Sequence, residues 1–237
     1  MNEDQQDQSK EISFLLKSMK SEYLHDTMTK GKFCFNHPTV FSKWEDPSAA
    51  QYDPWDAHDA FAVRHIVAAR IIGYKEGKPV YAPGKEIAPN GISHMQSNTV
   101  KHTPICCFRY IEPKEFVIKE NGIEYSLGEN ADRILHEFGH DAYIIIPIKP
   151  FLERLKQRIG NYMAMAVVYR DVLNDYQFNV EEQYEEFVEQ LFRKDAKYAW
   201  QKEYRIILPP TLISPVLVEL GSIEDIASCG NIADLKY

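Results

Sequence analysis

Residues 200–208 have the sequence Trp-Gln-Lys-Glu-Tyr-Arg-Ile-Ile-Leu, in which polar side chains lead into an apolar run. Alternation along a strand puts Gln201, Glu203 and Arg205 on one face, opposite the side chains between them. Three polar side chains on one face of a strand whose other residues are mostly apolar have two interpretations. Either Glu203 and Arg205 form a surface ion pair on an edge strand, or the guanidinium holds the Glu203 carboxylate in a cleft.

Short strands clustered around scattered helices make up the rest of the predicted chain. They do not alternate regularly as strand, helix and strand, which favours an α+β class over a doubly wound sheet. The expected single catalytic domain covers residues 11–237 after a polar tail at 1–10, with a Gly- and Pro-rich insertion near 73–101. The predicted strands span 32–35, 104–108, 142–147, 163–169, 203–208 and 217–220, with a hairpin over 115–125 that turns at Asn121-Gly122. The predicted helices span 21–31, with Ser21 as N-cap and Gly31 at the end, and 58–74, 129–141, 151–159 and 179–195.

The composition excludes several classes of protein. The chain has 237 residues, of which 44% are apolar and 26% charged, which is typical of a globular protein and not of a disordered or coiled-coil one. No apolar run approaches the roughly 20 residues needed to cross a bilayer, and the acidic N-terminus lacks the features of a signal peptide. We therefore expect a cytoplasmic protein without a membrane partner. The net charge of −8 excludes non-specific coating of nucleic acid, although a local basic cleft stays compatible with it.

The segment His136-Glu137-Phe138-Gly139-His140 matches the H-E-x-x-H pattern of zinc hydrolases. On a helix, this spacing places His136 and His140 on one face, with Glu137 as general base for a metal-bound water. A catalytic zinc needs a third protein ligand, for which Glu153 is the nearest candidate. The competing interpretation is a short surface helix with solvated histidines.

An aromatic and acidic segment over residues 35–59 includes Phe41, Trp44 and Asp46. Linkers rarely carry two Trp and a Tyr, so we expect a structured loop. One interpretation is a turn at Asp46 that caps a helix. A second is a rigid aromatic wall that lines a ligand cleft. A third makes residues 41–59 the docking patch of a non-enzymatic interaction module.

The order of these motifs resembles a large bacterial family of unknown function. That family has Phe-Asn-Asp-Pro near its start and Trp-x-x-Glu-x-Glu-x-Arg near its end. This chain has Trp-Glu-Asp-Pro at 44–47 instead, and Gln201 in place of the first glutamate. The residues that carry the resemblance are Phe35, Pro38, Phe41, Asp46 and Pro47, a central Cys-Cys-Phe strand, and then Lys194, Trp200, Glu203 and Arg205.

The closing strand also resembles the Glu/Gln-x-Glu turn of mono-ADP-ribosyltransferases, with Gln201 and Glu203 at the matching positions. The resemblance implies two small, mostly antiparallel sheets with flanking helices around a cleft. This cleft would bind NAD as co-substrate, and no metal is expected. Glu203 would be the catalytic carboxylate, which holds the nicotinamide ribose 2′-hydroxyl and stabilises an oxocarbenium-like transition state. Gln201 would orient the acceptor nucleophile.

The same resemblance implies further contacts to NAD. Phe41 and Trp44 would stack on the nicotinamide, and Lys17 or Arg109 would meet the pyrophosphate. The expected cofactor-binding residues are Lys17, Phe41, Trp44, Asp46, Arg109 and Arg205.

Cleavage of a glycosidic bond to a cationic leaving group needs one well-placed carboxylate and little acid catalysis, so a lone glutamate with a clamp is sufficient. The expected partner is a macromolecular acceptor, which can be protein, RNA or DNA. Enzymes of this class in a bacterial or phage setting are often toxins or phage-defence effectors. By that analogy alone, we expect a cognate inhibitor or antitoxin.

Overall fold

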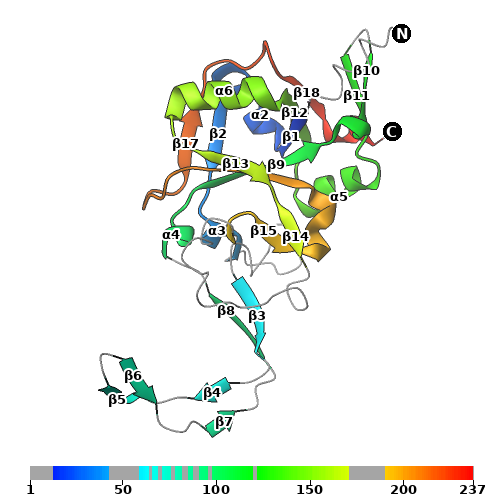
Figure 1. Cartoon of the computed structure of the whole chain (residues 1–237). Coiled ribbons are helices and arrows are strands. Elements are labelled where there is room, and N and C mark those ends of the chain that lie inside the picture. The colour runs from blue at the N-terminus through cyan, green and yellow to red at the C-terminus, as the bar shows by residue number, and fades with distance from the viewer. Residues whose placement is uncertain are drawn as a thin grey trace, which may run out of the picture.

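The central element of the fold is a six-stranded antiparallel sheet with the strand order β13-β16-β9-β1-β12-β18 (Figure 1). It belongs to a computed structural model that describes residues 13–42, 59–63, 66–68, 71–75, 78–81, 85–87, 91–95, 98–119, 122–170 and 190–236. The chain is therefore α+β with mostly antiparallel sheets, as the sequence predicts. The sheet strands are β13 (Met163–Ala166), β16 (Glu203–Ile207), β9 (Ile105–Ile111), β1 (Phe14–Met19), β12 (Ala142–Pro147) and β18 (Ser228–Asn231).

The other described strands form two-stranded sheets, of which all but β14 with β15 are antiparallel. Strands β3 to β8 lie apart from the six-stranded sheet (Figure 1). The pairs are β2 (Lys32–Phe35) with β17 (Val216–Glu219), β10 (Phe116–Lys119) with β11 (Gly122–Tyr125), β14 (Val168–Arg170) with β15 (Arg193–Asp195), β3 (Asp59–Val63) with β8 (Gly91–Met95), β4 (Ile66–Ala68) with β7 (Lys85–Ile87), and β5 (Ile71–Lys75) with β6 (Lys78–Tyr81).

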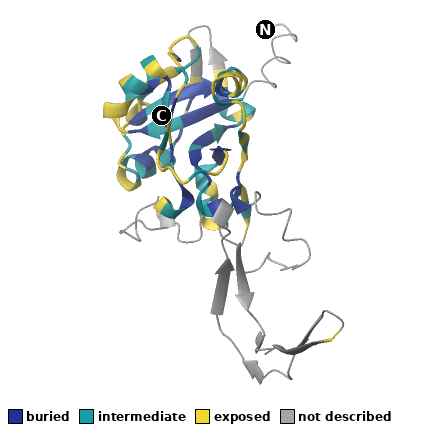
Figure 2. Ribbon diagram, turned by 90° about the vertical axis from the view of Figure 1, so that its left-hand side faces the viewer, coloured by how far each residue is buried: buried dark blue, intermediate teal, exposed yellow. Residues whose placement is uncertain are grey.

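Apolar side chains pack on both faces of the six-stranded sheet. Much of the sheet is accordingly coloured as buried in Figure 2. In β1, Leu15 joins the apolar cluster that includes residues of β2 and of the helices at 21–30 and 148–159, while Leu16 joins the cluster that includes residues of the helices at 129–137 and 232–235. The α-helices are α2 (Ser21–Lys30), α3 (Pro38–Ser42), α4 (Asn98–Lys101), α5 (Glu129–Glu137) and α6 (Ile148–Ile159), and the 3-10 helices are η1 (Pro113–Glu115), η2 (Ala196–Gln201) and η3 (Ile232–Leu235).

The ends of helix α2 differ in how well the sequence predicts them. The predicted end is confirmed, because Gly31 adopts the left-handed conformation with φ of 60°. The predicted N-cap is wrong, since Lys20 occupies that position and Ser21 is the first helical residue. The backbone N–H and the hydroxyl of Ser21 both donate to Asp141, which lies next to β12. A tertiary contact thus replaces the local cap.

Three other predictions need correction. The helix predicted over 58–74 is wrong, because β3, β4 and part of β5 occupy this stretch. Its apolar spacing fits a helical period, but short apolar strands satisfy the same spacing. The helix over 179–195 falls mostly outside the described residues, and its last three residues form β15. In the hairpin, Gly122 is not a turn residue as predicted, because it is the first residue of β11 and pairs with Lys119.

The core under α6 provides a test of the packing. Phe151 is fully buried, and its ring centroid lies 5.1 Å from that of Phe33 and 5.4 Å from that of Phe108. Phe151→Ala removes these contacts and leaves a cavity, so we expect it to lower the free energy of unfolding by about 3–5 kcal/mol. Chemical denaturation measures the loss. Leu212→Ala, at a highly exposed side chain, should stay within about 0.5 kcal/mol of the unchanged protein. Equal effects of both changes would contradict this packing.

Candidate active site

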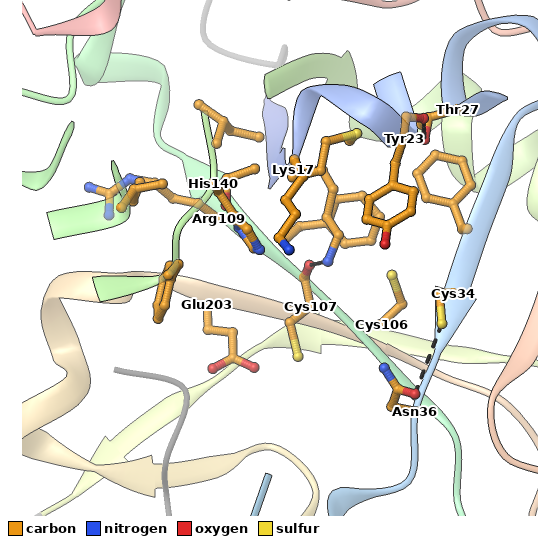
Figure 3. Close-up of a pocket in the computed structure, with 18 of the residues that line it drawn as sticks. Lys17, Tyr23, Thr27, Cys34, Asn36, Cys106, Cys107, Arg109, His140 and Glu203 are labelled. Atoms are coloured by element: carbon orange, nitrogen blue, oxygen red, sulfur yellow. Dashed lines mark hydrogen bonds between the residues drawn. The ribbon is translucent and has the colours of Figure 1, made fainter. Parts of the chain in front are cut away.

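The six-stranded sheet splits between its two central strands. β1 and β9 pair only through residues 14–16 and 109–111. Beyond these pairs, β1 follows β12 to Met19, while β9 follows β16 back to Ile105. A cavity of about 640 Å³ lies at this split, and its wall includes residues 16–20 and 105–109 (Figure 3). Residues of α2 and β2 contribute to it from one side of the sheet, and residues of α5 and η2 from the other.

Lys17 lies inside the split. Its Nζ donates to the backbone carbonyl of Cys107 at 2.7 Å and lies 5.6 Å from the centre of the Phe108 ring. This hydrogen bond gives a partner to a carbonyl that β1 no longer reaches, and it places a positive charge in the middle of the cavity wall. Lys17 thus lines the cavity, and its predicted contact with a pyrophosphate stays a prediction.

A buried group of charges forms the wall on the β16 side. The Nε of Arg205 donates to Oε1 of Glu203 at 2.6 Å, and the Nζ of Lys194 donates to Oε2 of the same carboxylate at 3.1 Å. Glu203 is 6% exposed and Arg205 is 0% exposed. The strand that carries them lies between β13 and β9, not at an edge of the sheet. The interpretation of Glu203 and Arg205 as a surface pair on an edge strand is therefore wrong.

The carboxylate of Glu203 is held in its charged form. Burial disfavours the charge, but the positive charges of Arg205 and Lys194 outweigh burial and hold the pKa of Glu203 far below its usual value. The thiol of Cys107 also makes a hydrogen bond to this carboxylate. Burial, and then the Glu203 charge, raise the pKa of Cys107 well above its usual value, so this thiol stays protonated. The cavity wall therefore contains an ionised carboxylate, which accepts hydrogen bonds from Arg205, Lys194 and Cys107.

The turn before β16 brings Gln201 to the same cluster. Gln201 ends η2, and Lys202 follows with a left-handed φ of 44°, so the strand begins at Glu203. The alternation predicts that Gln201 shares a strand face with Glu203. This prediction is wrong, because β16 begins at Glu203 and Gln201 belongs to η2. Its Oε1 nevertheless accepts from Nζ of Lys194 at 2.9 Å. Lys194 thus joins the two residues of the predicted Gln-x-Glu pair.

Lys202 and Tyr169 fix the start of β16. The Nζ of Lys202 reaches Glu112 at 3.2 Å and Glu115 at 2.6 Å, beside η1. The backbone N–H of Glu203 donates to the hydroxyl of Tyr169 at 2.7 Å. Burial raises the pKa of Tyr169 to about 12, so the hydroxyl stays neutral. These contacts fix the start of β16 and thereby the position of the Glu203 carboxylate in the cavity wall.

Aromatic side chains from α5 and η2 form another part of the wall. Trp200 stacks with Phe138 at a centroid distance of 5.8 Å, and the Arg133 guanidinium lies 3.8 Å from the Trp200 ring centre. Arg109 supports this arrangement from β9, because its Nη1 donates to the carbonyl of Trp200 at 2.6 Å and its Nε to the hydroxyl of Tyr125 at 2.9 Å. Arg109, Phe138 and Trp200 all line the cavity.

The predicted residues have different outcomes. Lys17, Arg109, Gln201 and Glu203 line the same cavity, whereas Arg205 supports Glu203 from behind and is not part of the lining. Trp44 and Asp46 lie outside the described residues. Of the interaction patch at 41–59, the structure describes only the backbone of Phe41 and Ser42, at the end of α3, and of Asp59, in β3. Sequence reasoning assigned no role to Lys194, Trp200 or Phe138. The only signal for Lys194 and Trp200 is their place in the family motif order.

The two imidazoles of the His-Glu-x-x-His segment do not share a helix face. Helix α5 ends at Glu137, and Gly139 turns the chain with a left-handed φ of 63°. His136 is exposed, and Glu137 pairs with Arg133 at 3.0 Å. Among the described residues, no three metal-ligating side chains gather at one place. The geometry that the zinc hydrolase interpretation requires is thus not present.

His140 instead faces the cavity near Lys17 (Figure 3). Its Nδ1 lies 2.9 Å from the hydroxyl oxygen of Ser18, at hydrogen-bond distance. Burial, and then the nearby charges of Lys17 and Lys20, lower the pKa of His140 to about 4. The ring is therefore neutral at physiological pH and offers polar contacts without a charge.

The cavity is positively charged although the chain as a whole is acidic. Five basic side chains and two acidic ones are among the described residues that line it, whereas the net charge of the chain is −8. Such a focus of one charge sign in a cleft favours an anionic ligand. The basic lining residues are Lys17, Lys20, Lys32, Arg109 and Lys194, and the acidic ones are Asp26 and Glu203.

No protein-family model, no curated protein and no solved structure matches this chain. Within the part of the chain that the structure describes, no helix is both long and apolar enough to cross a lipid bilayer.

The buried ion group predicts a large effect of Glu203→Gln on stability. The neutral side chain leaves Arg205 and Lys194 without their counter-charge, so we expect a loss of about 3–5 kcal/mol at pH 7 by urea denaturation. Because the folded-state pKa of Glu203 is lowered, its contribution is complete above the unfolded pKa and declines as the pH falls below it. The difference between variant and unchanged protein should therefore narrow in acid. A variant as stable as the unchanged protein at pH 7 would contradict the buried ion group.

The lowered pKa of His140 predicts that acid reduces the stability of the fold by a second route. Its folded pKa of about 4 lies below the unfolded value of 6.5, so stability is complete above pH 6.5 and falls between pH 6.5 and 4. His140→Gln removes this titration, and its stability relative to the unchanged protein should rise by up to about 3 kcal/mol over that range. Urea denaturation at stepped pH measures the difference. His136→Gln, at the exposed histidine, serves as the matched control, and an equal effect there would refute a special environment for His140.

Proposed function

We propose that the protein is an NAD-dependent ADP-ribosyltransferase in which Glu203 is the catalytic carboxylate. The observation that carries the proposal is an ionised, buried carboxylate in the wall of a positively charged cavity, with Gln201 tied to it through Lys194. An anionic dinucleotide with a cationic nicotinamide needs both features, a basic cavity for its phosphates and a carboxylate for its reacting sugar. The resemblance of residues 200–208 to the Glu/Gln-x-Glu turn supports the same reading of the site.

The cavity is suited in size and shape to an extended ligand. Its volume of about 640 Å³ lies within the range of small-molecule and cofactor sites. It passes through the split in the sheet, so a two-headed ligand can place one end near Glu203 and the other near α2 and β2. Lys17 lies between these ends, where it would meet the pyrophosphate. Trp200 and Phe138 give the Glu203 end a flat apolar wall for the nicotinamide ring.

The reaction breaks the bond between the nicotinamide nitrogen and C1′ of the ribose. The electron pair leaves with nicotinamide, which becomes neutral, and positive charge develops on the ribose. Glu203 would accept a hydrogen bond from the 2′-hydroxyl and stabilise that charge. The acceptor nucleophile then bonds to C1′ and loses its proton to solvent or to a base. No acid is required, because the leaving group is already cationic.

Gln201 would orient the acceptor, which we propose to be a macromolecule. Its amide lies at the turn before β16, beside Lys194 and at the edge of the cavity. Loss of Gln201 should therefore impair transfer more than it impairs cleavage of NAD. Gln201→Ala separates the two steps, since released nicotinamide reports cleavage and labelled ADP-ribose on an acceptor reports transfer.

The proposal predicts that nicotinamide release from NAD depends on Glu203. Glu203→Gln should reduce release by at least about 100-fold, because a neutral amide cannot stabilise the developing charge. Glu203→Asp keeps the charge and most of the ion pairing, so it serves as the better-folded variant, and it should also lose most activity because the carboxylate is displaced. Chromatography of nicotinamide, after incubation with NAD and a cell lysate, measures release.

Glu153→Gln is the matched control, since Glu153 is an exposed carboxylate on α6 that does not line the cavity. It should release nicotinamide at the unchanged rate. Circular dichroism confirms that each variant is folded before rates are compared. NAD consumption by folded Glu203→Gln and Glu203→Asp at the unchanged rate would overturn the proposal.

A further inference from the structure

We propose that His37 and His102 form a zinc site that joins the two ends of the segment running from α3 to α4. His37 directly precedes α3, and His102 directly follows α4, while the two helices contact each other. Neither histidine lines the large cavity, although Asn36, next to His37, does. The inference is thus independent of the proposed transferase activity.

The main evidence is a pair of buried ring nitrogens that lack hydrogen-bond partners. His37 is 6% exposed, and its Nε2 has no partner. The Nδ1 of His102 is likewise buried and without a partner. A buried polar atom without a hydrogen bond costs free energy, so two of them on neighbouring rings require an explanation. A bound cation that accepts both lone pairs removes the cost.

The distance between the rings fits a shared metal ion. The centroids of the two imidazoles lie 5.5 Å apart with an interplanar angle of 79°. A zinc–nitrogen distance of about 2.0–2.1 Å, with the ring centre about 1.1 Å beyond the nitrogen, puts two rings at a tetrahedral angle about 5.2 Å apart and two opposed rings about 6.4 Å apart. The observed spacing is close to the tetrahedral value.

The surroundings hold His37 as a metal ligand requires. Its ring makes a hydrogen bond to the backbone of Thr211, and its backbone N–H donates to the Ser214 hydroxyl at 3.4 Å. The backbone N–H of Thr211 in turn donates to the carbonyl of His102 at 2.8 Å. A ligating histidine commonly bonds a backbone group through its other nitrogen, which fixes the ring. Imidazole ligands suit zinc among the common divalent ions.

The site would have a structural role. Within the described residues no third metal-ligating side chain joins the pair, so two coordination positions are left for water or another donor. A metal that links residues 37 and 102 closes a long loop of the unfolded chain, and binding to the folded state alone raises stability. Zinc would therefore stabilise the junction of α3, α4 and the loop over 209–215.

The test is calorimetric titration of the full chain with Zn²⁺ after dialysis against a chelator. We expect one equivalent to bind and to raise the melting temperature. His37→Gln and His102→Gln should each weaken binding by at least about 10-fold. His102→Gln is the more tolerant variant, because His102 is only partly buried. With Cu²⁺ in place of Zn²⁺, electron paramagnetic resonance should show coupling to imidazole nitrogens that either variant reduces.

His136→Gln and His140→Gln are the matched controls, and both should bind Zn²⁺ as the unchanged protein does. Failure of the folded, metal-free protein to bind Zn²⁺ would overturn the inference. So would binding that survives His102→Gln and is lost in His136→Gln, because it would place the metal at the His-Glu-x-x-His segment. Neither result would bear on nicotinamide release, so the zinc site and the transferase proposal can fail separately.

Discussion

Glu203 keeps a negative charge inside the protein because two cations lie within hydrogen-bond distance of its carboxylate. Arg205 is fully buried on the interior strand β16, a position that a guanidinium occupies only when it is paired. Lys194 reaches the same carboxylate from β15. The charge group therefore connects β16 to β15. Removal of the carboxylate affects the fold and the cavity wall together.

The split between β1 and β9 gives this charge group its surroundings. If the two strands paired along their full lengths, Lys17 would have no space between them. Instead, the pairing stops after residues 14–16, and Lys17 bonds the carbonyl of Cys107 across the gap. The cavity and the position of Lys17 in its wall thus follow from one interruption in the sheet. In this arrangement the middle part of an extended anionic ligand would contact Lys17.

The sequence predicts the local features of the site and misses those that depend on distant segments. Alternation correctly places the side chains of Glu203 and Arg205 on one face, because this relation depends on a single strand. Lys194 escapes prediction because its approach to Glu203 depends on the parallel pairing of β14 with β15. The His-Glu-x-x-His pattern misleads because Gly139 ends the helical course before His140. The helix predicted over 58–74 fails because apolar spacing alone does not separate a helix from short strands.

In the proposed enzyme, the ionised Glu203 would face the reacting ribose of NAD. A crystal structure of the full chain with a non-cleavable NAD analogue tests this placement. We expect the 2′-hydroxyl of the nicotinamide ribose within hydrogen-bond distance of a Glu203 carboxylate oxygen, with the pyrophosphate beside Lys17. An analogue that binds elsewhere, or an empty cavity at saturating analogue, would contradict the account.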